Sequence, residues 1–236
     1  MRVGELAKQL SVTSETIRRD LAELTEQGVL ARTYGGAVLR QSDEPVLSER
    51  HKERVAERDA IARHAAPLLK GAKVVMLGSG ATTLQVAKRI AVEMREITVI
   101  THAFGVATAL SFNPTIRVLM LPGLYHSTEG AMHGSQTVRF LERLNADWSV
   151  IGASGLSADG PSDALPDAAD VYASMMARSS QRMVVADSSK FDRAFTARYA
   201  DWVEVGCLVT DDAPQGALRE ALEQAGTRTI VAATAR

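Results

Sequence analysis

The stretch V-V-M-L-G-S-G-A-T-T-L occupies residues 74–84 and joins an apolar run to a helical pattern through a glycine-rich turn. Four consecutive apolar residues that end at a glycine are typical of a strand buried on both faces. From residue 82 to residue 90, apolar side chains recur at the spacing of a helix that buries one face. A buried strand that leads directly into a helix is the unit from which parallel sheets are built, so this stretch predicts an α/β domain.

The same alternation continues to the end of the chain. We predict further buried strands at residues 97–100, 118–121, 148–151, 183–186, 208–210 and 229–232, and helices at 82–90, 104–110, 138–144 and 218–225. This order predicts an open, mostly parallel sheet with helices on both faces. In such sheets ligands bind outside the carboxyl ends of the strands, so the segments that follow each strand are the candidate binding segments.

The turn after the first of these strands has the composition of an anion-binding site. Backbone amides at the start of a helix carry partial positive charge, and serine and threonine hydroxyls add hydrogen-bond donors. The residues of this candidate cradle are Ser79, Gly80, Ala81, Thr82 and Thr83. The stretch matches neither the dinucleotide fingerprint nor a P-loop with its lysine, so it does not imply a nucleotide. An ordinary strand-to-helix turn with a serine or threonine cap is the alternative interpretation.

Polar residues follow the other predicted strands as well. The candidate ligand contacts there are His102, Gly123, Ser154, Asp159 and Lys190. Lys190 is the best candidate for a cation beside a phosphate or a sugar hydroxyl, although a lone lysine in a loop is ordinarily exposed. Asp159 opens an acidic stretch, up to Asp170, that we read as a long loop. A solvated loop with a helix cap is the alternative for this stretch.

The first 40 residues carry a different pattern. Residues 3–10 have the apolar stripe of a short helix, and a second helix is predicted to begin at Ser14 and to stop at Gly28. Residues 29–39 alternate around two glycines, which predicts a small hairpin. Two short helices followed by a hairpin are typical of a winged helix-turn-helix, in which the second helix enters the DNA major groove.

Polar side chains lie on this second helix away from its apolar stripe. Arginine bonds guanine edges or phosphates, and short hydroxyl side chains reach the oxygens of the DNA backbone. The candidate DNA contacts are Thr13, Ser14, Thr16, Arg18 and Arg19 on the helix, with Arg32, Tyr34 and Gly35 in the hairpin. Taken alone, an arginine pair on an amphipathic helix is more often solvated surface, which is the alternative for Arg18 and Arg19.

These motifs together resemble one family of bacterial regulators. The segments S-E-T-I-R-R-D-L-A-E-L and G-V-L-A-R-T-Y-G-G-A resemble the DNA-binding part of the DeoR family of transcriptional regulators. Farther along, S-G-A-T-T, G-A-S-G-L, D-G, A-D-S-S-K-F and V-T-D resemble, in order, the effector-sensing domain of the same family. The resemblance implies a sensing domain similar in fold to ribose-5-phosphate isomerase. In the family this sensing domain binds phosphorylated sugars or related metabolites.

The chain also departs from the family pattern. The family has a further helix before V-G-E-L-A, whereas this sequence begins at Met1 without it, so we expect either a late start or a partly uncovered apolar face on the helix-turn-helix. The family's E-A-E-V-K run reads A-A-D-V-Y at residues 168–172. Ala81 stands where the family has a threonine, Thr101-His102 where it has T-N, and Pro122-Gly123 where it has a Gly-Gly pair. These changes leave the phosphate cradle in place but predict an effector other than the commonest ones.

Composition limits the kind of protein. Lysine and arginine number 27 against 28 aspartates and glutamates, and the net charge is −1, so a DNA-binding surface must concentrate its basic residues locally. No apolar run approaches the roughly 18 residues of a membrane span, and the start lacks a signal peptide core, so we expect a cytoplasmic protein without a membrane partner. The single cysteine, Cys207, is expected to be buried and inert. The histidines have no paired metal spacing, and we expect no metal and no cofactor.

The sequence thus predicts a winged helix-turn-helix at residues 1–40, a linker at 41–55 and an α/β sensing domain at 56–236. The leading hypothesis is a transcriptional regulator, a repressor of carbohydrate genes, that binds an operator in double-stranded DNA as a homodimer or homotetramer and responds to a phosphorylated sugar. No catalytic residue is expected. One alternative is a sugar-phosphate isomerase that uses Asp159 or Asp163 with Lys190. Another is a sensor whose first domain no longer binds DNA.

Overall fold

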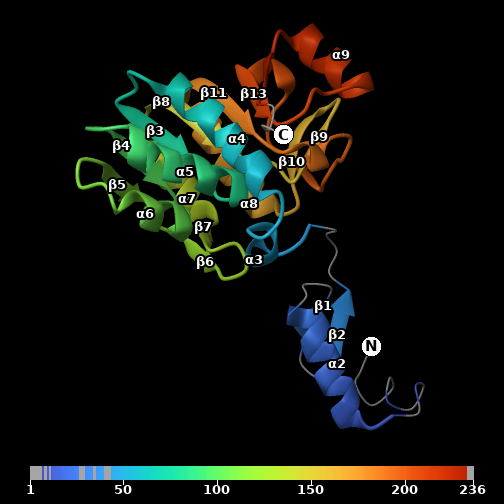
Figure 1. The fold of residues 1–236 in the computed structure, drawn as a ribbon. Helices are drawn as coiled ribbons and strands as arrows, with labels where there is room; N and C mark the ends of the chain where they lie inside the picture. Colours follow the sequence, from blue (N-terminus) through green and yellow to red (C-terminus); the bar gives the residue numbers. More distant parts are fainter. Residues whose placement is uncertain are drawn as a thin grey trace. The chain divides into compact units, whose positions relative to one another are not determined.

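A computed structural model describes residues 7, 10, 12–26, 30–33, 36–39 and 44–232, with side chains described for 7, 10, 12–23 and 44–232. The chain divides into two compact units, Met1–Arg50 and His51–Arg236, and each is described by itself. Figure 1 shows the helices and strands of both.

The smaller unit is centred on helix α2 (Ser14–Glu26). The Thr13 side chain caps it, because Thr13 Oγ1 accepts a hydrogen bond from the Thr16 N–H at 3.1 Å. Ile17 is buried, as the apolar stripe predicts. Of the helix predicted at residues 3–10, only Ala7 and Leu10 are described, and Ala7 is helical and buried. The predicted stop at Gly28 lies outside the described residues.

A hairpin follows α2 in the chain. Strand β1 (Leu30–Thr33) pairs antiparallel with β2 (Gly36–Leu39), and Thr33 is the partner of Gly36. The hairpin predicted at residues 29–39 is therefore present, with Gly36 in the second strand rather than in the turn. A short helix, α3 (Leu47–Arg50), comes next, within the stretch 41–55 that was predicted as a linker.

The larger unit contains a seven-stranded sheet. Its strands are β3 (Val74–Leu77), β4 (Thr98–Thr101), β5 (Arg117–Met120), β8 (Ala146–Ile151), β11 (Ser179–Val185), β13 (Cys207–Thr210) and β14 (Arg228–Val231). They lie in the order β14-β13-β11-β8-β3-β4-β5, and each neighbouring pair is parallel. The predicted fold class, an α/β protein with an open parallel sheet, is confirmed.

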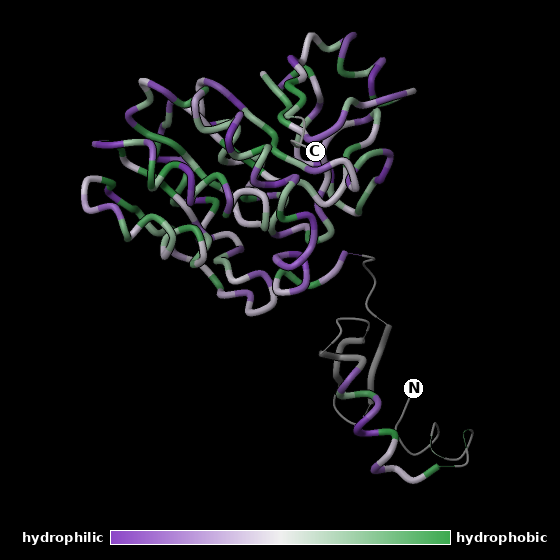
Figure 2. Tube along the Cα trace, in the orientation of Figure 1, coloured by the Kyte–Doolittle hydropathy of each residue, from purple (hydrophilic) through white to green (hydrophobic). Residues whose placement is uncertain are grey.

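Helices cover both faces of this sheet. Helices α4 (Val55–Ala65), α5 (Ala81–Glu93) and α6 (Phe104–Leu110) pack on one face, and α7 (Ser135–Leu141), α8 (Pro166–Ala177) and α9 (Gly216–Ala225) pack on the other. Successive strand residues point to opposite faces, so Val75 and Leu77 belong to the first core and Met76 to the second. Both cores are apolar, which is why the strands read as continuous hydrophobic runs (Figure 2).

Several short elements lie outside the main sheet and were not predicted. Strands β6 (Leu124–His126) and β7 (Ala131–His133) form a hairpin, and β9 (Gly155–Ser157), β10 (Gly160–Asp163) and β12 (Ala197–Arg198) form a small antiparallel sheet. The 3-10 helices are η1 (Ala66–Leu69), η2 (Ser188–Lys190) and η3 (Trp202–Glu204). These strands have two to four residues each, too few to show a period of two in the sequence.

The acidic stretch from Asp159 to Asp170 is not the long loop that the sequence suggested. Its first part forms β10, and its last part is the start of α8, where Pro166 occupies the first turn. Proline is favoured there because its missing N–H has no partner to lose at a helix start. Among the described residues, no helix is long and apolar enough to cross a membrane.

Candidate functional site

The strand order places a topological switch point between β3 and β8. From β3 the chain moves outward through β4 to β5, and it then returns to β8 on the other side of β3. The connections leaving β3 and β8 therefore run in opposite directions, which opens a crevice at the carboxyl ends of these two strands. The two loops approach closely there: a Cβ atom on Gly152, after β8, would lie 3.6 Å from Ser79 O and 3.8 Å from Thr83 Cγ2.

The start of α5 lines this crevice from the β3 side. Gly80 precedes the helix with φ of 130°, a backbone conformation that favours glycine. The first backbone N–H groups of a helix have no hydrogen-bond acceptor within the helix, because no helical turn precedes them. They also form the positive end of the helix dipole. In α5 these amides belong to Ala81, Thr82 and Thr83. The five predicted cradle residues are thus contiguous, at the position where parallel sheets bind ligands.

Two of the predicted residues, Ser79 and His102, hold each other in place. His102 Nε2 accepts a hydrogen bond from the Ser79 N–H at 3.1 Å, and His102 Nδ1 donates to Met132 O at 2.8 Å. Burial lowers the pKa of His102 to about 3, with a further contribution from His133, so the ring is neutral. Both ring nitrogens are engaged within the protein. The geometry gives His102 the task of positioning the turn rather than of presenting a nitrogen to a ligand.

Two tyrosines that were not among the predicted site residues complete this wall. Tyr172, on α8, shares a 2.7 Å hydrogen bond between its hydroxyl and Ser79 Oγ. Tyr199 donates to Gly152 O at 2.7 Å, and the two rings meet edge to face with centroids 5.4 Å apart. Tyr172 stands where the family pattern has lysine, which marks it in the sequence. No sequence signal marks Tyr199.

The segment after β11 brings a buried ion pair and Lys190 to the same edge of the sheet. Asp187 Oδ2 lies 2.9 Å from Nε of Arg58, on α4, and both side chains are buried. Burial opposes ionisation of Asp187, but bonds from Ser189 and the charges of Arg58 and Lys190 outweigh it, and the pKa stays below its ordinary value. Lys190 is buried in η2. Lys190 follows β11, and the cradle follows β3. These two strands are separated by β8 alone, so they lie about 10 Å apart.

The remaining three predicted contacts lie apart from the cradle or serve packing. Gly123 leaves no room for a side chain, because a Cβ atom there would lie 2.2 Å from Thr137 Oγ1. Ser154 is buried and donates to Asp163 Oδ2 at 3.2 Å. Asp159 is exposed in the turn between β9 and β10, at the opposite end of that hairpin from Ser154.

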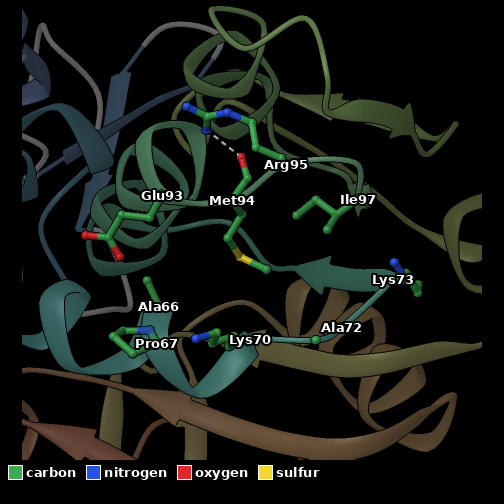
Figure 3. Close-up of a pocket in the computed structure, with 10 residues that line it drawn as sticks. Ala66, Pro67, Lys70, Ala72, Lys73, Glu93, Met94, Arg95 and Ile97 are labelled. Carbon is green, nitrogen blue, oxygen red and sulfur yellow. Dashed lines mark hydrogen bonds between the residues drawn. The ribbon is translucent and has the colours of Figure 1, made fainter.

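A separate pocket of about 470 Å³ opens at the other edge of the sheet (Figure 3). It lies where β3 begins and α5 ends, and its charged lining residues are Lys70, Lys73, Glu93 and Arg95. Arg95 Nη1 bonds the carbonyl of Met94 at 2.7 Å. Because ligands of parallel sheets bind at the carboxyl ends of the strands, this pocket is not part of the candidate site. In the part of the chain that the structure describes, no cluster of three His, Cys, Asp or Glu side chains is placed to hold a metal ion.

The candidate DNA contacts on α2 are presented to solvent. Thr13, Ser14, Arg18 and Arg19 are exposed and Thr16 is half-buried. Arg18 pairs with Glu15 at 3.5 Å and Arg19 with Asp20 at 3.9 Å, both as exposed pairs. Arg32 lies in β1, where its partner across the hairpin is Ala37, and its side chain is not described. Tyr34 and Gly35 lie outside the described residues.

Comparison with known protein families gives two matches. The DeoR-like helix-turn-helix domain matches residues 1–43, and the DeoR C-terminal sensor domain matches residues 53–212.

Curated relatives cover nearly the whole chain. The transcriptional repressor AccR of Agrobacterium fabrum is 31% identical over 98% of this chain and 86% of its own length. The repressor GlcR of Bacillus subtilis is 30% identical over 96% of this chain and 88% of its own. The glycerol-3-phosphate regulon repressor of Escherichia coli is 28% identical over 92% of this chain and 87% of its own.

Solved structures also match this chain at low sequence identity. A chain of the tetrameric eIF2B-beta2-delta2 complex from C. thermophilum matches with a TM-score of 0.51 and 15% identity, over 75% of this chain and 63% of that one. Ribose 5-phosphate isomerase A from Neisseria gonorrhoeae matches with a TM-score of 0.42 and 13% identity, over 57% of this chain and 52% of that one.

Proposed function

Because this chain belongs to the DeoR family of transcriptional regulators, we propose that it is a repressor whose larger unit binds a phosphorylated sugar and thereby changes the affinity of the smaller unit for an operator. Residues 1–40 bind DNA, residues 41–55 link the two parts, and residues 56–236 sense the effector. The protein acts in the cytoplasm on carbohydrate genes. Operators with two-fold symmetry favour a homodimer or homotetramer.

One observation carries the effector proposal: the amides of Ala81, Thr82 and Thr83 open a helix at the switch point of the sheet. A phosphate bound there would meet unpaired donors and the positive end of the helix dipole. In this proposal Lys190, which follows a strand two places from β3, contacts the far end of a molecule larger than phosphate itself. One relative is named for the glycerol-3-phosphate regulon that it represses, and this name agrees with this class of effector.

Exposed arginines support the DNA proposal. The pairs Arg18–Glu15 and Arg19–Asp20 are exposed and long, and such pairs contribute little to stability, so DNA phosphates or guanine edges can replace the carboxylates at small cost. Helix α2 presents these arginines in its first half, the part of a recognition helix that reaches base edges.

The isomerase alternative has little support. Isomerisation requires a carboxylate poised over the substrate carbon. Asp159 is exposed in a hairpin turn, while Asp163 accepts bonds from the Ser154 hydroxyl and the Leu165 N–H. Asp159 thus faces solvent, and both carboxylate oxygens of Asp163 are engaged within the protein.

The proposal is tested by fluorescence anisotropy with DNA from the region upstream of the protein's own gene, with sugar phosphates added one at a time. Wild type should bind this DNA and at least one sugar phosphate should change its affinity, since an effector shifts DNA binding by its differential affinity for the two conformers. Arg19→Ala should weaken DNA binding by about 1–3 kcal/mol. Lys190→Met should keep DNA binding and lose the response.

Arg63→Ala, on the exposed side of α4, serves as the matched arginine control for both measurements and should leave them unchanged. If no DNA is bound while a sugar phosphate is converted to product, the protein is an enzyme and the proposal is wrong.

A further inference from the structure

Among the described residues, one histidine beside the candidate effector site has no hydrogen-bond partner. His133, at the end of β7, is 3% exposed, and neither Nδ1 nor Nε2 is bonded to any group of the described residues. Buried polar groups in native proteins are nearly always paired, and a group left unpaired costs free energy. An unpaired imidazole at the ligand-binding edge of a sheet therefore requires an explanation.

The neighbours of His133 show that no group of the described residues takes this role. Its ring lies 5.3 Å from that of His102 and 5.6 Å from that of His126, measured between centroids. His102 has both nitrogens engaged with Ser79 and Met132. His126 Nδ1 is bonded to the Thr128 hydroxyl at 3.2 Å. His133 is thus separated from the cradle residue Ser79 by a single imidazole.

The charged groups around His133 indicate which kind of ligand group can form hydrogen bonds with it. Burial and the neighbouring His126 hold the pKa of His133 below its ordinary value, against the opposing carboxylates Glu129 and Asp167. The ring is therefore neutral at pH 7 and offers one N–H donor and one acceptor nitrogen. A phosphate accepts hydrogen bonds only, and near Glu129 and Asp167 it would be repelled. A hydroxyl group both donates and accepts, as the ring does.

We propose that His133 binds a hydroxyl of the uncharged carbon chain of the effector and so helps to determine which phosphorylated polyol the protein recognises. This inference rests on the proposed function, which places the phosphate at the start of α5. The cradle then holds the group that all such effectors share, and His133 contacts the part in which they differ. In this arrangement His133 recognises a hydroxyl group of the sugar, whereas the cradle recognises the charged phosphate.

The test compares two substitutions at this position. His133→Phe keeps a ring of similar size but has no donor or acceptor, whereas His133→Gln keeps both a donor group and an acceptor. Affinities are measured by calorimetry for glycerol 3-phosphate, ribose 5-phosphate, glucose 6-phosphate and inorganic phosphate. His133→Phe should weaken binding of the preferred sugar phosphate by about 10-fold, the loss of one or two hydrogen bonds, and leave inorganic phosphate unchanged. His133→Gln should retain most of the affinity.

The imidazole ¹⁵N signals of wild type provide a readout that does not depend on a variant folding. Those of His133 should report a neutral ring and should shift when the sugar phosphate binds, but not with inorganic phosphate. The inference is overturned if wild type binds a sugar phosphate and these signals do not move, or if folded His133→Phe binds it as tightly as wild type. If wild type binds none of the four ligands and its affinity for DNA does not change when they are added, the proposed function is wrong and this inference is wrong with it.

Discussion

Replacing Asp187 by alanine should destabilise the larger unit by about 3–5 kcal/mol, the cost of removing one partner of a buried ion pair. Asp187 and Arg58 have side chains only 0% and 4% exposed, and their atoms meet at 2.9 Å. Arg58 Nη1 also donates to Glu53 O at 2.8 Å, which holds the guanidinium in place after its counter-charge is removed. The variant also loses the bonds from Ser189 to Asp187.

The assay is thermal and urea unfolding followed by circular dichroism at pH 7. For a unit of this size, His51–Arg236, the expected loss corresponds to a fall in melting temperature of about 6–20 °C. Asp59→Ala, which breaks the exposed pair with Arg63 on the same helix, is the control and should cost about 0.5 kcal/mol or less. The double variant Arg58→Met with Asp187→Leu should recover much of the loss, because it removes both charges together.

The pH dependence of the same pair gives an independent check. The pKa of Asp187 is lower in the folded protein than its ordinary value, so its contribution is complete above about pH 4 and is lost as the pH falls through the lower, folded pKa. The gap in stability between wild type and Asp187→Ala should therefore narrow at acid pH. A loss below about 1 kcal/mol at pH 7, or a gap that does not depend on pH, would refute the view that this pair is buried and ionised.

Three further predictions concern other parts of the larger unit. Gly123→Ala should destabilise it by about 1–3 kcal/mol in urea unfolding, since the new methyl would overlap Thr137 Oγ1; unchanged stability would contradict this packing. The folded pKa of His102, about 3, lies below its ordinary value, so stability is complete above about pH 6.5 and falls as the pH drops from there toward 3. His102→Gln should flatten that part of the stability curve, and an equally steep curve would count against a buried neutral ring. Burial raises the pKa of Cys207 to about 11, so a thiol reagent at pH 8 should modify it only as fast as the protein unfolds, and immediate labelling would contradict the burial.

The alternation of strands and helices was predictable because local hydrophobic patterns in the sequence indicate each element. Strands such as Val74–Leu77 and Cys207–Thr210 are covered by helices on both faces, so their residues are apolar without interruption. The turn that forms the candidate cradle was predictable for the same reason, because Gly80 and the threonines that follow it are neighbours in the chain and open α5. The winged helix-turn-helix also follows from local signals, namely the stripe on α2 and the glycines of the hairpin.

Tertiary structure alone decided which strands are neighbours, and with them the partners of the polar groups. Nothing in the local pattern says that β8 returns beside β3, yet this places the switch point at Ser79 and Gly152. Arg58 and Asp187 are 129 residues apart, and no local pattern indicates that they form an ion pair. His102 looked like a ligand residue until the hairpin β6–β7 brought Met132 to its other nitrogen. A hydrogen bond or an ion pair depends on where two groups lie in space, and the packing of distant segments determines those positions. Secondary-structure propensity and the period of the hydrophobic pattern depend only on neighbours along the chain.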